Sequence, residues 1–99
     1  MADPAAMARL NTLLEGVDFT PPSPAGKEDW VYRDIPLVAK RYWHFLTKEL
    51  LGEENYMFIA GTDRGDSVRG QLFISPQGMK NLSAFNALPD EERTARIPE

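Results

Sequence analysis

Four carboxylates flank the apolar segment 56–60 and are the clearest candidates for acid–base or cation chemistry. Glu53 and Glu54 precede this segment, and Asp63 and Asp66 follow it. If the four converged at one end of a strand, paired carboxylates would bind a divalent cation or transfer protons. Their spacing matches no calcium-binding loop, and no neighbouring His or Lys suggests a catalytic partner. We therefore interpret them as a solvated acidic rim, and keep a small enzyme or ligand-binding domain as an alternative.

Few other residues have side chains suited to catalysis. Thr62, Ser67 and Ser75 carry hydroxyl groups, but the sequence places no base for any of them. The chain has one histidine and no cysteine, which excludes a thiol nucleophile, a disulfide and a thiolate metal site. We predict no catalytic residue, no cofactor and no metal site, and the sequence favours a protein that is not an enzyme.

The segment Lys40-Arg41-Tyr42-Trp43-His44 combines cations with aromatic rings, which are the residue types that pair with phosphates and stack on bases. Residues 35–51 carry three bases and one acid, although the whole chain has a formal charge of −4. On a helix, Tyr42 points to the apolar side and Lys40 points away from it, so only Trp43 shares an edge with the cations.

A second polar and aromatic set, Arg69, Gln71 and Phe73, shares one face of a predicted strand. Together with the edge at Trp43, this face would form a platform for a single-stranded nucleic acid. The chain is acidic overall, which disfavours non-specific binding of nucleic acid, so we keep a single-stranded nucleic-acid-binding domain as the first alternative rather than the leading hypothesis.

Arg64-Gly65-Asp66-Ser67 is the tetrapeptide of integrin-binding loops. Asp, Gly and Ser are also the residues that a hairpin turn requires, so we interpret the tetrapeptide as a turn. The start of the chain lacks the basic and apolar regions of a signal peptide, and no stretch has membrane-spanning length. We therefore expect a cytoplasmic protein that does not enter a membrane.

The stretch 34–52 would position most of these side chains. Its apolar residues recur at helical spacing and fall in one broad arc at about 100° per residue. We predict that it forms the main helix, with Asp34 or Ile35 as the cap. Pro36 suits the first turn, because the residue before a proline avoids the helical region. Gly52 would end the helix in the left-handed conformation.

Three residues depart from this helical pattern. Leu37 and Leu51 lie on the polar side of the predicted helix, and Glu49 lies inside the apolar arc. We expect the carboxylate of Glu49 to reach water from the last turn, the alternative being a partner such as Arg69.

Residues 56–60 and 68–74 predict an antiparallel β-hairpin. The first segment is apolar on both faces, which is typical of a central or covered strand. The polar residues 61–66 supply the turn. Because a lone hairpin is marginally stable, we expect residues 30–33 to add a third strand.

Shorter helices are predicted at both ends of the chain. Ser75-Pro76 starts one, and the acids after Pro89 start another that stops at Ile97-Pro98. Asp3-Pro4 predicts a helix that ends at Gly16 and carries Leu10 and Leu14 on its apolar face. Residues 17–29 contain a Pro-rich segment, which we interpret as an extended, stiff spacer.

These elements predict a small α+β protein with a single domain. We divide the chain into an N-terminal helix and Pro-rich arm, residues 1–29, and an α+β core domain, residues 30–99. In the core domain a strand, a helix, a β-hairpin and short helices follow one another. A chain of 99 residues with 42% hydrophobic content is long enough to bury such a core.

The leading functional hypothesis is a small, acidic, intracellular protein–protein interaction module: an accessory subunit, an adaptor, or a regulator or inhibitor of a larger protein. Aromatic and apolar side chains exceed the apparent needs of a small core, and interface centres favour such residues. The partner would be another protein, whose identity the residues do not specify. The expected contact residues are Leu10, Leu14, Trp30, Leu37, Trp43, Leu51, Arg69 and Phe73.

Overall fold

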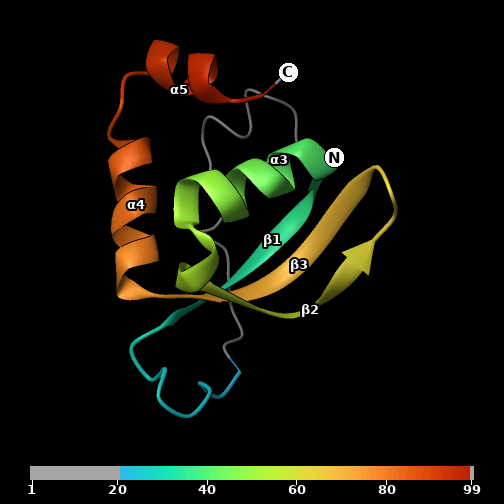
Figure 1. Ribbon diagram of the computed structural model, residues 1–99, viewed down its shortest axis with the longest axis vertical. Helices are drawn as coiled ribbons and strands as arrows, with labels where there is room; N and C mark the ends of the chain where they lie inside the picture. The colour runs from blue at the N-terminus through green and yellow to red at the C-terminus, as the bar shows by residue number, and fades with distance from the viewer. Residues whose placement is uncertain (1–20, 99) are drawn as a thin grey trace.

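The computed structural model describes residues 21–98 and confirms the α+β class. A three-stranded antiparallel sheet carries a helix on one face and further helices at one end (Figure 1). In chain order the elements are β1 Val31–Ala39, α3 Lys40–His44, the π-helix η1 Phe45–Leu51, the 3-10 turn η2 Glu53–Asn55, β2 Tyr56–Asp63, β3 Ser67–Ile74, α4 Pro76–Asn86 and α5 Asp90–Arg96. The predicted N-terminal helix lies outside the described residues.

Strand β1 is longer than predicted, and the main helix is shorter. β1 continues to Ala39, so the helix begins at Lys40, and the prediction that Pro36 lies in the first helical turn was wrong. Pro36 instead lies in an edge strand, between Ile35 and Val38, where the pairing with β3 is irregular. An edge strand tolerates proline at such a place. Ile35 and Val38, which the predicted helix would have buried, are also buried in the strand, where each is 1% exposed.

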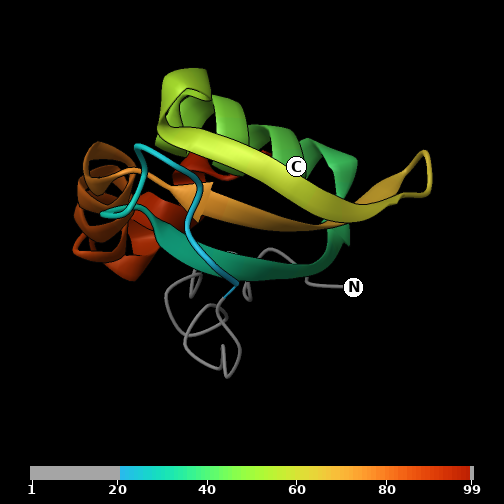
Figure 2. The ribbon, with the colours of Figure 1, turned by 90° about the horizontal axis from the view of Figure 1, so that it is seen from below.

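The hairpin of β2 and β3 and the third strand are confirmed, but their order differs from the expectation. The strand order is β1-β3-β2, so β3 is central and β2 lies at an edge (Figure 2). The prediction that residues 56–60 form a central or covered strand was therefore wrong. β3 takes the centre because β1 pairs with it on one side, from Val31 opposite Ile74 to Ala39 opposite Ser67.

The main helix changes its geometry at Phe45. From there to Leu51 it is a π-helix, and the Gly52 N–H donates to the Thr47 carbonyl oxygen, five residues earlier, at 3.1 Å. The wider turn rotates later residues away from their α-helical positions. Leu51, placed on the polar side by the α-helical pattern, is 1% exposed for this reason.

The helix ends at Gly52, whose φ of 94° is the positive value expected of the stop residue. Glu49 is exposed in the last turn, as predicted. The partner considered for it, Arg69, instead lies 3.2 Å from Asp34 on the other face of the sheet.

A buried polar cluster joins the end of the helix to α4. Ser75 caps α4 as predicted: its Oγ accepts from the Gly78 N–H at 3.0 Å. The same Oγ donates to Asn55 Oδ1 at 2.8 Å, and Asn55 Nδ2 donates to the Leu51 carbonyl oxygen at 2.8 Å. Asn55 and Ser75 thus satisfy each other's buried polar groups while fixing three chain segments.

The main hydrophobic core lies between the sheet and the helices. Helix α3 and η1 cover one face of the sheet, and α4 packs against η1 (Figures 1 and 2). Phe45 and Phe85 meet edge to face across the helical contact, with 5.8 Å between their ring centroids. Helix α5, predicted from Pro89 onward, is present, and Ile97 after it is 5% exposed.

The opposite face of the sheet carries a separate aromatic pair. Tyr32 and Phe73 are 6% and 2% exposed, and their ring centroids lie 5.7 Å apart. Burial is the main cause that raises the pKa of Tyr32. The charge of Asp34 raises this pKa further, whereas Arg69 lowers it.

Part of the predicted Pro-rich spacer, residues 21–29, is described, and from Pro24 onward it folds into turns. The Lys27 N–H donates to the Pro24 carbonyl oxygen and the Trp30 N–H to the Lys27 carbonyl oxygen, both at 3.0 Å. Gly26, with φ of 81°, permits the first of these turns. The expectation of an extended spacer was therefore wrong for this part.

Within residues 21–98, every helix falls short of the length and apolar character needed to cross a bilayer.

Candidate functional site

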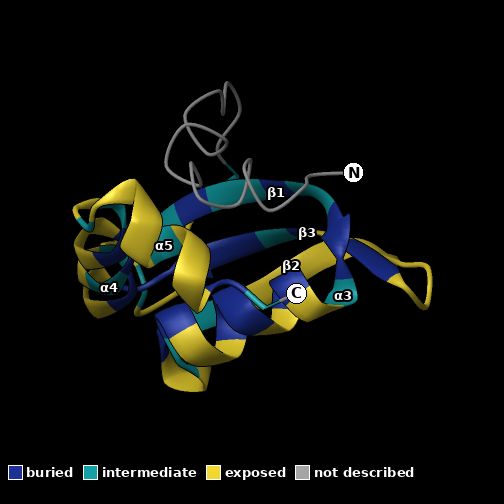
Figure 3. Cartoon of the chain, turned by 90° about the horizontal axis from the view of Figure 1, so that it is seen from above, coloured by how far each residue is buried: buried dark blue, intermediate teal, exposed yellow. Residues whose placement is uncertain are grey.

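The outer edge of β2 is the most exposed part of the sheet. Six of its eight residues, 58–63, are exposed (Figure 3). Among them are the two exposed large apolar side chains of the described chain, Phe58 at 48% and Ile59 at 40%. Apolar side chains on a free strand edge mark a contact surface or an aggregation hazard. We call residues 58–63 the β2 edge.

The register of the hairpin identifies backbone groups that point away from β3. The Arg64 N–H donates to the Ser67 carbonyl oxygen at 2.8 Å, which makes these two residues a hydrogen-bonded pair. Hydrogen-bonded and non-hydrogen-bonded pairs alternate along an antiparallel ladder. The N–H and C=O groups of Asp63 and Gly61, opposite Val68 and Gly70, are therefore directed outward. They are free to pair with an added strand.

Trp43 and two opposed glycines form the floor beside the β2 edge. Gly61 and Gly70 pair across the strands, and a Cβ on Gly70 would lie 2.4 Å from the Trp43 ring. Phe58 meets this ring edge to face, with 6.0 Å between the centroids. Trp43 is 9% exposed, so it supports Phe58 from below while about half of Phe58 remains in water.

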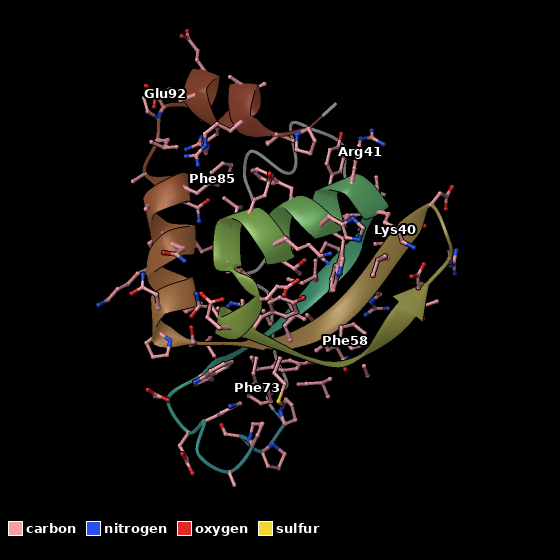
Figure 4. All side chains as sticks on the ribbon, in the orientation of Figure 1. Lys40, Arg41, Phe58, Phe73, Phe85 and Glu92 are labelled. Carbon is pink, nitrogen blue, oxygen red and sulfur yellow. The ribbon has the colours of Figure 1, made fainter. Side chains whose placement is uncertain are left out.

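Cations of the helix border the same strand. Lys40 Nζ lies 3.0 Å from Asp63 Oδ2, which ties the start of α3 to the end of β2 (Figure 4). The Gly65 N–H, donating to Asp63 Oδ1 at 2.8 Å, is the main cause that lowers the pKa of Asp63. Lys40 lowers this pKa as well, and His44 does so to a smaller extent. Lys40 thus holds the first turn of α3 against the end of β2.

The expected contact residues are scattered over the molecule. Leu10 and Leu14 lie outside the described residues. Leu51, Phe73 and most of Trp43 are buried. We had expected these side chains to be more than a small core needs, but the fold itself buries them.

The remaining three are more accessible. Trp30 is half-buried with Lys27 Nζ 4.5 Å from its ring centroid, and Leu37 is half-buried in β1. Arg69 is exposed and paired with Asp34.

The platform considered for a nucleic acid is divided between the two faces of the sheet. Arg69 and Phe73 alternate along β3 with Gly70 and Leu72, and Gly70 lies under Trp43. Residues that alternate along a strand point to opposite faces. Arg69 and Phe73 therefore lie on the face away from Trp43, and Figure 4 shows Phe73 remote from helix α3. The two halves do not form one continuous surface.

The four carboxylates of the acidic rim do not converge. Glu53 and Glu54 come before the start of β2, whereas Asp63 ends it and Asp66 lies in the turn. They thus occupy opposite ends of a strand of eight residues. Within residues 21–98 no group of three or more His, Asp or Glu side chains is placed to hold a metal ion.

A cleft of about 370 Å³ lies between η1, α4 and α5. Its lining residues are Glu49, Leu50, Asn81, Ala84, Phe85, Leu88 and Arg96. Glu49 and Arg96 bring opposite charges to it, but both are exposed at its rim. Solvent screening makes such charges weak anchors for a ligand.

Comparison with known proteins finds no family model, no curated protein and no solved structure that matches the chain. We therefore infer the function from the geometry of the β2 edge and its surroundings.

Sequence reasoning missed Phe58 and Ile59 as contact residues. The signal was the apolar character of residues 56–60 on both faces. We interpreted it as a covered strand, but an edge strand with exposed apolar side chains has the same pattern. Sequence alone does not distinguish the two, because the order of strands depends on which of them pairs with β1.

Proposed function

We propose that the chain is a protein-interaction module, of the accessory or adaptor kind, that receives an extended segment of another protein along the β2 edge. The observation that carries this proposal is the exposure of Phe58 and Ile59 at consecutive positions of an edge strand. Strand addition of this type uses main-chain hydrogen bonds for affinity and side-chain contacts for specificity.

The two edge strands differ in how they are protected. Edge strands that must not pair usually carry charges, prolines or bulges. β1 contains Arg33, Asp34 and Pro36, whereas Asp63 is the only charged residue of β2, which has no proline. The register shift between Phe58 and Ala60 leaves 60–63 as the regular stretch. Of these protective features β2 has only the bulge at Ile59 and one terminal charge, so it is less protected than β1.

The energies indicate a weak, reversible complex. Each added main-chain hydrogen bond contributes about 0.5–1.5 kcal/mol net. Covering the exposed halves of Phe58 and Ile59 adds about 1 kcal/mol each, since full burial of such a side chain is worth about 1.5–3 kcal/mol. After the cost of ordering the segment, we expect dissociation constants on the order of micromolar or weaker.

A charge placed on the β2 edge tests this function. Random eight-residue peptides displayed on phage would be selected against the wild-type chain, and the selected peptides titrated by calorimetry. We expect Ile59→Lys to weaken their binding about tenfold or more, because a lysine on the edge opposes strand pairing.

Ala95→Lys is the matched control. It adds the same charge at an exposed position of α5, which Figure 1 shows at the other end of the molecule from β2. Circular dichroism would verify that both variants fold. Equal binding by the two variants, or the selection of no peptide by the wild-type chain, would contradict the proposed function.

A further inference from the structure

The ring of Phe58 lies over a pair of glycines on the face of the sheet that the helix covers. A Cβ on Gly61 would lie 3.0 Å from Phe58 Cζ, and a Cβ on Gly70 would lie 2.8 Å from Phe58 Cε2. The Trp43 ring contacts Phe58 from the side of the helix. These contacts hold the part of the Phe58 ring nearest β3, so its exposed part faces the free side of β2.

The register of β2 determines which residue of an added antiparallel strand would lie beside this ring. The N–H and C=O groups of Gly61 point outward, so the residue opposite Gly61 would form a hydrogen-bonded pair with it. Side chains directly opposite each other in antiparallel strands lie on the same face. Because Gly61 has no side chain, the space between that residue and the Phe58 ring is open.

The paired stretch offers no charge to an added segment. Residues 56–62 contain no Asp, Glu, Lys, Arg or His. Asp63, the next residue along the strand, is compensated by Lys40 at 3.0 Å. A charged side chain placed against this stretch would lose hydration without gaining an opposite charge. The segment that complements this edge in charge is therefore an uncharged one.

The charges at the two ends of β2 do not alter this preference. Arg64 and Asp66 at the hairpin tip carry opposite charges. Glu53 and Glu54 precede the strand, and a segment that pairs with residues 58–63 does not extend over them.

We propose, on the basis of the function proposed above, that the segment received by β2 is uncharged and places a large apolar side chain opposite Gly61. This side chain packs against the exposed part of the Phe58 ring. The backbone groups of Gly61 and Asp63 bind any extended chain, whereas Phe58 selects among chains by this one side chain.

A peptide fits the β2 edge better than a single-stranded nucleic acid does. Residues 56–63 include no Lys or Arg to pair with phosphates. Phe58 is the only exposed aromatic side chain among residues 21–98, whereas single-stranded nucleic acids stack on several rings.

Four matched peptides test the preference for an uncharged, apolar residue. Each is a capped peptide of seven threonines in which the central residue is replaced by phenylalanine, alanine, lysine or glutamate. Chemical-shift titration measures their dissociation constants. We expect the phenylalanine peptide to bind about fivefold more tightly than the alanine peptide, a difference of about 1 kcal/mol, because its ring pairs with Phe58. The lysine and glutamate peptides should bind no more tightly than the alanine peptide, and about 0.5 M salt should not weaken binding of the phenylalanine peptide.

A pair of variants locates the preference on the protein. Phe58→Ala should reduce the ratio between the phenylalanine and alanine peptides to less than about twofold. Thr62→Ala is the matched control, because it truncates an exposed side chain of β2 that alternates with Gly61 to the other face. It should leave the ratio unchanged. Circular dichroism would verify that both variants fold. In the wild-type chain, nuclear Overhauser effects between the peptide ring and the Phe58 ring test the same contact without any variant.

The outcomes separate this inference from the proposed function. Equal binding of the phenylalanine and alanine peptides, or tighter binding of a charged peptide, would overturn the inference and leave the proposed function standing. The absence of binding by all four peptides would overturn the inference alone if phage selection still yields peptides that Ile59→Lys weakens. It would overturn both if the selection yields none.

Two further measurements identify the competing occupants. Retention of oligothymidine, with nuclear magnetic resonance shifts on the helix rather than on β2, would overturn the inference in favour of a nucleic acid. A dimeric solution mass that Ile59→Lys reduces to a monomer would overturn it in favour of a second copy.

Discussion

The indole ring of Trp43 meets the ring of Phe58 edge to face, with 6.0 Å between their centroids, directly above Gly70. This contact connects the core to the β2 edge, since one ring is buried and the other is half in water. Replacement of Gly70 by alanine should therefore disturb both. We expect Gly70→Ala to destabilise the fold by about 1–3 kcal/mol, the range typical of overpacking.

Urea denaturation of four proteins would measure this coupling: wild type, Gly70→Ala, Trp43→Phe and the double variant. The smaller ring of phenylalanine should relieve the contact, so Gly70→Ala should be less destabilising in the Trp43→Phe background. An equal loss of stability from Gly70→Ala in both backgrounds would show that contact with the Trp43 indole does not cause the destabilisation.

The π-helix makes a second prediction about core residues. Leu51 is 1% exposed because of the wider turn, so Leu51→Ala should destabilise the fold by about 2–5 kcal/mol. Leu37, which the helical pattern also placed on the polar side, is half-buried in β1. Leu37→Ala should therefore be clearly less destabilising. Thermal or urea denaturation would rank the two, and the opposite ranking would contradict the register of the helix.

The cluster of Asn55 and Ser75 should behave as one unit. Asn55→Ala leaves the buried Ser75 hydroxyl proton without an acceptor, and leaves the Leu51 carbonyl oxygen with Asn81 Nδ2 as its side-chain donor. We expect a loss of about 1–3 kcal/mol. Ser75→Ala removes the cap of α4 and should cost about 1–2 kcal/mol. The double variant should lose less than the sum, because the two residues share one hydrogen bond. Strict additivity of the two losses would contradict a shared cluster.

Alkaline pH should destabilise the fold through Tyr32. Burial raises the pKa of this phenol in the folded state, so the unfolded chain releases the proton more readily. Stability from this group is complete below the ordinary tyrosine pKa of about 10 and is lost as pH rises toward the folded value.

Denaturation curves at pH 8 to 11 would show this loss. Tyr32→Phe should be less sensitive to pH across that range. An unchanged slope in Tyr32→Phe would mean that other groups cause the alkaline loss.

The sequence predicts which residues begin and end the helices better than it predicts which segments pair with one another. Ser75 and Gly52 act as helix boundaries through local geometry, and both were identified from residue type alone. Pro36 misled because a proline suits either the first helical turn or an edge strand. Only pairing with β3, which lies some thirty residues later in the chain, decides between them.

The candidate site was harder to predict for the same reason. Phe73 and Leu51 were expected at an interface but are buried by tertiary packing and by the π-helical turn, neither of which has a signature in a window of the sequence. Phe58 and Ile59 became candidates only when the strand order placed β2 at an edge. Exposure of an apolar strand is a property of the whole sheet and not of its own residues.

Amide hydrogen exchange by nuclear magnetic resonance, with and without a selected peptide, tests the central claim most directly. Strand addition predicts that the outward amides of Gly61 and Asp63 become protected on binding, while the amides of β1 stay unchanged. A peptide that binds without protecting these two amides would contradict pairing at the β2 edge.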